Sequence, residues 1–90
     1  MNTVNQRRAL WAEIALDAFR AEVGLDAVED TLSDLLSDLG HLCDAKGLDY
    51  LALVAKAIGD WKLEQVDPES IDCRPKVTIT VGARRLKRLT

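Results

Sequence analysis

The hydrophobic positions of residues 26–47 recur at the spacing of an α-helix. Most of them lie three or four positions apart: Val28, Leu32, Leu35, Leu36, Leu39, Leu42 and Cys43. At 100° per residue these side chains fill one arc of about 120°, and the acidic residues of the stretch lie on the opposite side. We therefore predict a central helix that needs an apolar neighbour, with Asp26 as its N-cap and Gly47 at its end.

Two flanking stretches also predict helices. Residues 4–23 end at Gly24, and their apolar side gathers Leu10, Trp11, Ile14, Ala18 and Ala21, with Phe19 at its margin. Residues 50–66 follow the capping residue Asp49 and end before Pro68. The apolar side of that helix holds Tyr50, Leu51, Val54, Ala57, Ile58 and Trp61. Short connectors around Gly24 and Gly47 favour antiparallel neighbours, so the expected fold is mainly α, with three antiparallel helices in residues 1–66.

The pattern changes after a connector at residues 67–75, which contains two prolines. Residues 76–81, KVTITV, alternate polar and apolar side chains and are β-branched from 77 to 81, which predicts a strand in the segment 76–90. One strand is not stable alone, and no second strand pattern occurs in the chain. We therefore expect pairing between chains, either in a homodimer through residues 77–81 or with the sheet edge of another protein.

The length of the chain allows one domain with a small core, so association with another chain would add needed stability. No run of eighteen apolar residues predicts a membrane span, and the start MNTVNQRRAL lacks the apolar region of a secretory signal. We therefore expect a cytoplasmic protein in which Cys43 and Cys73 are thiols rather than a disulfide.

The net charge of −3 conceals a strong asymmetry along the chain. Residues 1–73 contain fifteen acidic and six basic residues, a balance of −9, whereas residues 74–90 contain six basic residues and no acid. Such a division is typical of two surfaces with different partners, and it is equally compatible with a basic end that neutralises its own acidic body.

An acidic row on the central helix is the main candidate for a functional surface. Asp30, Asp34, Asp38 and His41 are separated by four, four and three residues, and Asp44 follows them. Three interpretations stand: a solvated face, a docking surface for a basic protein, or ligands for Mg²⁺ or Mn²⁺. We take the row as a candidate partner-binding site and expect no metal. No catalytic residue is assigned, because His41 has no positioned Ser or Cys nucleophile.

The basic end is a candidate nucleic-acid interface. Its cations would neutralise phosphates, whereas the absence of interleaved aromatic residues does not favour stacking on single strands. The alternative is a solvated terminus. The residues concerned are Lys76, Thr78, Thr80, Arg84, Arg85, Lys87 and Arg88.

Three resemblances extend these predictions. The pattern DLLSDLGHLCD at 34–44, followed by GLDY and a helix with Ala and Trp, resembles a group of short uncharacterised proteins of bacterial plasmids and prophages. That resemblance implies a helical fold and a genomic setting. Residues 34–49 are also similar to the later half of all-α nucleotide pyrophosphohydrolases of the MazG kind, which hold Mg²⁺ through an earlier ExxE pair. Here the first helix offers only Glu13, Asp17 and Glu22, so that metal box is incomplete.

The third resemblance concerns the C-terminal segment. KVTITV followed by ARRLKRL resembles the start of a ribbon-helix-helix DNA-binding protein, in which strands from two chains enter the major groove together. The resemblance implies that Thr78 and Thr80 face the bases, while Val77, Ile79 and Val81 pack inward.

The expected function is that of a non-enzymatic binding protein that needs no cofactor. It would act through its acidic helix face as an accessory or anti-defence factor of a mobile genetic element. The alternatives are a nucleic-acid-binding protein that uses residues 76–88, and a degenerate metal-dependent nucleotide pyrophosphohydrolase that uses Asp34 and Asp38.

Overall fold

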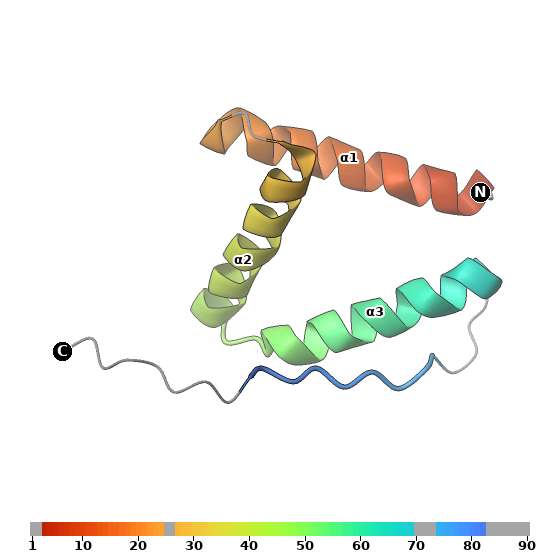
Figure 1. The fold of residues 1–90 in the computed structure, drawn as a ribbon. Helices are drawn as coiled ribbons and strands as arrows, with labels where there is room; N and C mark the ends of the chain where they lie inside the picture. The colour runs from red at the N-terminus through yellow and green to blue at the C-terminus, as the bar shows by residue number, and fades with distance from the viewer. Residues whose placement is uncertain (1–2, 25–26, 70–73, 83–90) are drawn as a thin grey trace.

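Three α-helices make up most of the computed structural model, which describes residues 3–24, 27–69 and 74–82 (Figure 1). They are α1 (Thr3–Val23), α2 (Val28–Lys46) and α3 (Tyr50–Val66). These bounds lie within two residues of those that the hydrophobic spacing predicts, so the mainly helical fold is confirmed. None of the described helices is both long enough and apolar enough to span a bilayer.

Local chemistry explains where the helices end. Gly47 follows α2 in the left-handed conformation (φ 70°), and the N–H of Leu48 donates to the carbonyl of Cys43 at 2.8 Å. A glycine adopts this conformation without strain, so the chain can turn sharply there. Asp49 then caps α3, since its carboxylate accepts the N–H of Ala52 at 3.1 Å.

The start of α2 differs from its prediction. Its N-cap is Ala27, which offers no side-chain cap, so the assignment of this role to Asp26 is wrong. Asp26 itself lies outside the described residues. The backbone carbonyl of Ala27 instead accepts both the N–H and the hydroxyl of Thr31, at 2.9 and 3.0 Å. This pair of bonds fixes the first turn of α2 without an acidic cap.

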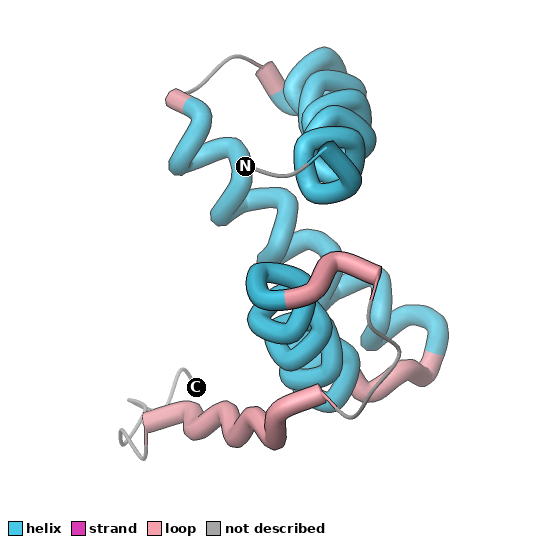
Figure 2. Tube along the Cα trace, turned by 90° about the vertical axis from the view of Figure 1, so that its right-hand side faces the viewer, coloured by secondary structure: helices cyan, strands magenta, loops and turns pink. Residues whose placement is uncertain are grey.

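The helices form an open arrangement rather than a side-by-side antiparallel bundle. α2 crosses between α1 and α3, which run along opposite edges of the molecule (Figures 1 and 2). The beginning of α1 and the end of α3 meet at Glu64, whose backbone carbonyl accepts from Asn5 at 3.0 Å and whose carboxylate lies 3.7 Å from Arg8. The radius of gyration is 15.9 Å, against about 12 Å for a compact chain of this length.

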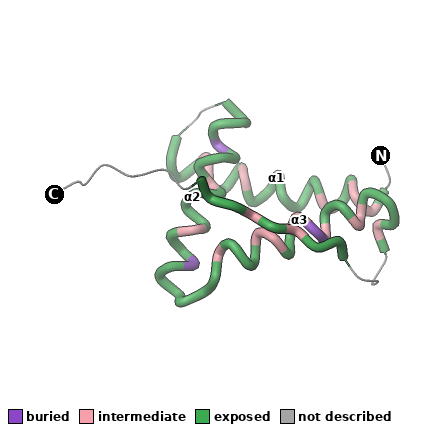
Figure 3. The backbone as a smooth tube through the Cα atoms, turned by 60° about the horizontal axis from the view of Figure 1, so that its bottom comes forward, coloured by how far each residue is buried: buried purple, intermediate pink, exposed green. Residues whose placement is uncertain are grey.

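Burial is correspondingly low. Among the described hydrophobic residues only Cys43 is buried, at 8% exposure, and the other six residues of the apolar arc of α2 are exposed or half-buried (Figure 3). Cys43 is a free thiol, as predicted, whereas Cys73 lies outside the described residues.

The face of α1 that packs inward is not the predicted one. Leu10, Trp11 and Ile14 are 58%, 61% and 67% exposed, while Leu16 and Phe19 on the other side are half-buried. Alanines surround α1 on nearly every side, so either face can approach a neighbouring helix closely. The helix therefore keeps an exposed row of large apolar side chains.

Residues 74–82 begin against α3 and then lead away from it as an extended segment, which forms no strand in the described part of this chain (Figures 1 and 2). Arg74 pairs with Asp60, and the carbonyl of Pro75 lies over the buried Gly59. The predicted strand is therefore not formed in the described residues, and Arg74 and Pro75 contact the chain's own α3 instead. The pairing of this segment with a second chain stays a prediction.

Candidate functional site

The acidic row lies along the solvent-facing side of α2. All five predicted residues are exposed: Asp30, Asp34, Asp38, His41 and Asp44. Aspartates four positions apart are about 6 Å apart along the helix axis, so the row is a nearly straight line of charge. Within the part of the chain that the structure describes, no lysine or arginine forms an ion pair with these carboxylates.

Two of these residues also line a small hollow at the corner between α2 and α3. Its volume is about 480 Å³, and it brings His41 and Asp44 together with Asp49. The ring of Tyr50 closes the corner, because it lies so near Gly40 that a Cβ there would be 3.1 Å from two ring carbons. The Tyr50 hydroxyl donates to the carbonyl of Leu36, which fixes α3 against α2.

A metal site does not emerge from this row. In residues 3–24, 27–69 and 74–82, no three His, Cys, Asp or Glu side chains gather closely enough to hold an ion together. Asp34 and Asp38 are successive members of an exposed helical row.

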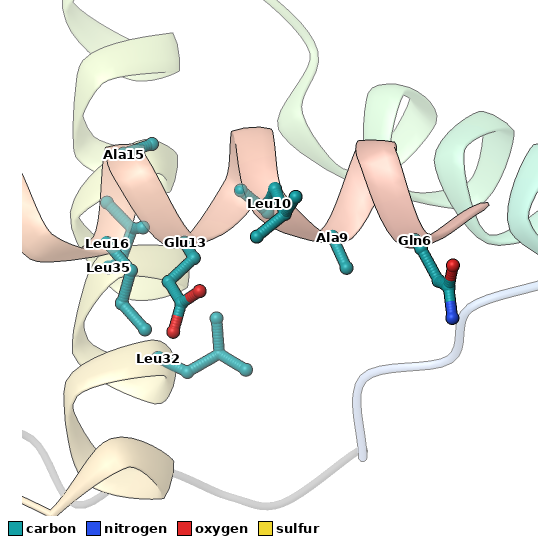
Figure 4. Close-up of a pocket in the computed structure, with 9 residues that line it drawn as sticks. Gln6, Ala9, Leu10, Glu13, Ala15, Leu16, Leu32 and Leu35 are labelled. Atoms are coloured by element: carbon teal, nitrogen blue, oxygen red, sulfur yellow. The ribbon is translucent and has the colours of Figure 1, made fainter. Parts of the chain in front are cut away.

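An apolar groove lies between α1 and α2 (Figure 4). Its volume is about 800 Å³, and its lining residues are Gln6, Ala9, Leu10, Ala12, Glu13, Ala15, Leu16, Leu32 and Leu35. The carboxylate of Glu13 points into the groove near Leu32 and Leu35 (Figure 4). A groove of this size and polarity suits the apolar side chains of another helix.

Sequence reasoning missed the groove as a site. Its signal in the sequence is the run of alanines at 9, 12 and 15, whose small side chains leave room beside the leucines of α2. The spacing alone could not show that α1 turns this side toward α2.

The extended segment divides the predicted nucleic-acid residues into two groups. Lys76, Thr78 and Thr80 are exposed, while Val77 and Ile79 between them are half-buried. This alternation places the two threonines on the outer side, as the ribbon resemblance implies. Val81, which the same resemblance expects to pack inward, is 72% exposed, so that part of the expectation is wrong. The remaining predicted residues lie outside the described part of the chain: Arg84, Arg85, Lys87 and Arg88.

Arg74 bears on whether the basic end neutralises the acidic body of its own chain. This residue belongs to the basic end, and it pairs with Asp60 of the acidic body. At least one basic residue of the segment therefore neutralises its own chain.

Comparison with family models, with curated proteins and with solved structures finds no match for this chain.

Proposed function

We propose that this chain is a non-enzymatic binding protein whose acidic row on α2 engages a basic surface of a second protein. The observation that supports this most is exposure without neutralisation: Asp30, Asp34, Asp38 and Asp44 face solvent, and no described cation pairs with them. Carboxylates held in a line on a helix attract a cationic surface, which speeds encounter and disfavours acidic competitors.

The apolar surfaces support the same class of function. Interfaces between proteins combine an apolar centre with a polar rim, and the chain offers both in the groove between α1 and α2 and in the charged side of α2. The resemblance of residues 34–44 to short plasmid and prophage proteins supports the setting that we propose, an accessory or anti-defence role in a mobile genetic element.

Charge reversal tests this proposal. The bait Asp34→Lys/Asp38→Lys carries two lysines in the middle of the row, and Glu22→Lys/Glu69→Lys makes the same change in net charge at exposed sites away from α2. We expect affinity capture from the producing cells to recover one basic protein with the wild type and the control bait. The reversed bait should retain it at least tenfold less, because attraction becomes repulsion at two positions. Equal capture by all three baits would reject the row as a binding face.

Nucleic-acid binding through residues 76–88 is the second candidate, and the alternating burial of residues 76–80 favours it. Val77 and Ile79 are half-buried, while Thr78 and Thr80 are exposed. On this hypothesis, segments of two chains pair as strands and present their threonines to the major groove.

A salt titration tests the second candidate. We expect the full chain to bind a 30-base-pair duplex with an affinity that falls steeply as salt rises, since each phosphate contact adds about −0.9 to the logarithmic slope. A chain that ends at Pro75 lacks five of the cations and both threonines, so it should lose most of the affinity and the slope. Identical weak binding by both chains would remove this candidate.

A further inference from the structure

We infer that a second copy of this chain docks in antiparallel orientation on the exposed stripe of α1, which we define as Arg7, Leu10, Trp11, Ile14 and Asp17. The inference goes beyond the proposed function, because the acidic row lies on a different helix and the stripe shares only Leu10 with the groove between α1 and α2. It also differs from a dimer through residues 77–81, since none of the stripe belongs to the C-terminal segment.

The stripe is a surface that α1 leaves uncovered. At 100° per residue its five members fall within one arc of about 120°, on the side of α1 opposite the half-buried Leu16 and Phe19. Leu10, Trp11 and Ile14 are each more than half exposed, and Asp17 is 65% exposed. An exposed tryptophan flanked by two branched aliphatic side chains is typical of the anchor of an interface.

The order of residues along the stripe is self-complementary. From Arg7 to Asp17 it reads one positive, three apolar and one negative residue, over about 15 Å of helix. If two copies cross antiparallel at the level of Ala12, Arg7 of each copy faces Asp17 of the other, and Leu10 faces Ile14. A two-fold axis then generates every contact twice, as in the commonest class of homodimer.

The two charges are available for this pairing. Among the described residues, no carboxylate lies within ion-pair distance of Arg7, and Asp17 meets only Arg20, at 4.0 Å. A second copy therefore supplies Arg7 with a partner, and Asp17 with one in addition to Arg20, at the rim of an apolar contact.

The chain as a whole exposes more surface than a compact protein of its size. The chain has an accessible surface of 7725 Å², whereas a compact protein of 9.9 kDa has about 5,200 Å². The excess is about 2,500 Å² per chain, and a standard interface removes about 800 Å² from each partner. A partner of another sequence would need a matching charge order, which a second copy provides by symmetry.

Charge swapping tests both the dimer and its register. Arg7→Asp places two acidic residues opposite each other, and Asp17→Arg places two basic residues opposite each other. We expect sedimentation at micromolar concentration to show a wild-type dimer and about tenfold weaker dimers for each single variant, since two symmetric ion pairs become repulsive. Mixing the two variants in equal amounts should restore dimers, and Arg7→Asp/Asp17→Arg should restore them within one chain type.

Two controls keep the outcome decisive. Glu29→Arg changes the charge as Asp17→Arg does, but at an exposed site of α2, and should leave the dimer unchanged. Trp11→Ala should weaken the dimer, whereas Trp61→Ala on α3, where the side chain is 55% exposed, should not.

Each contrary result overturns the inference. A wild type that is monomeric at all concentrations excludes the dimer. Single swaps that dimerise as the wild type does, or that fail to combine with each other, exclude this register, and equal effects of the two tryptophan variants exclude this face. A chain that ends at Pro75 should still dimerise, so failure of the acidic row or of the nucleic-acid candidate would not be confused with failure here.

Discussion

Gly59 determines where the C-terminal segment can lie against α3. Gly59 is buried and lies in the interior of α3. A glycine at such a position costs about 1 kcal/mol of helix stability relative to alanine. A Cβ at this position would stand 2.9 Å from the carbonyl oxygen of Pro75 and 3.2 Å from the Cδ of Arg74. The absence of a side chain at Gly59 therefore leaves the room that Arg74 and Pro75 need to contact the surface of α3.

Replacing this glycine should detach the segment while strengthening the helix. We expect Gly59→Ala to raise the intrinsic helix stability of α3 by up to about 1 kcal/mol, and to displace Pro75 because two atoms cannot approach so closely. Trypsin, with fragments identified by mass spectrometry, should then cut after Lys76 faster than in the wild type. Gly82→Ala is the matched control, since a Cβ there meets nothing within 4 Å. Equal cleavage rates in all three proteins would show that this contact does not hold the segment.

At the scale of elements, α2 and α3 begin in opposite ways. The carboxylate of Asp49 caps α3, whereas the N-cap of α2 is an alanine with φ −58° and ψ 149°, a backbone conformation that suits an N-cap. The acidic Glu29 and Asp30 in the first turn of α2 still favour its N-terminus through the helix dipole. The start of α2 is therefore the end that a side-chain cap would improve.

Exchanging the two kinds of cap should move stability in opposite directions. We expect Asp49→Ala to lower the free energy of unfolding by about 1 kcal/mol, because the N–H of Ala52 loses its acceptor. Ala27→Asp should raise it by about 0.5–1 kcal/mol by providing an acceptor at α2. Urea unfolding followed by circular dichroism measures both changes. Shifts of the same sign would contradict this account of the caps.

At the scale of the whole molecule, the elements could be predicted but their arrangement could not. The spacing of Leu32, Leu35 and Leu39 identifies α2. A glycine at 47 and an aspartate at 49 predict the end of α2 and the start of α3. The crossing of the helices depends instead on contacts between distant residues, such as Asn5 with Glu64, which leave no periodic signal.

The candidate surfaces likewise divide into one that the sequence predicts and two that it does not. The acidic row follows from helical spacing alone, so its exposure on one side of α2 was predictable. The groove and the stripe were not predictable, because α1 carries alanines on nearly every side. Its inward face is the one that carries the half-buried Leu16 and Phe19, and only packing decides that this face turns inward. For residues 76–81 the alternation predicts a strand, and these residues form none, because a ladder needs a second strand, which the described part of the chain does not contain.

The low burial of this chain has a consequence for its lifetime in a cell. Proteases and chaperones act on accessible apolar segments, and small changes in the fraction of accessible chains alter abundance several-fold. Leu10, Trp11 and Ile14 form such a segment until something covers them. We therefore expect newly made copies to be degraded quickly while they are few and to persist once they are numerous. The amount of protein in the cell should then rise more than proportionally with its rate of synthesis.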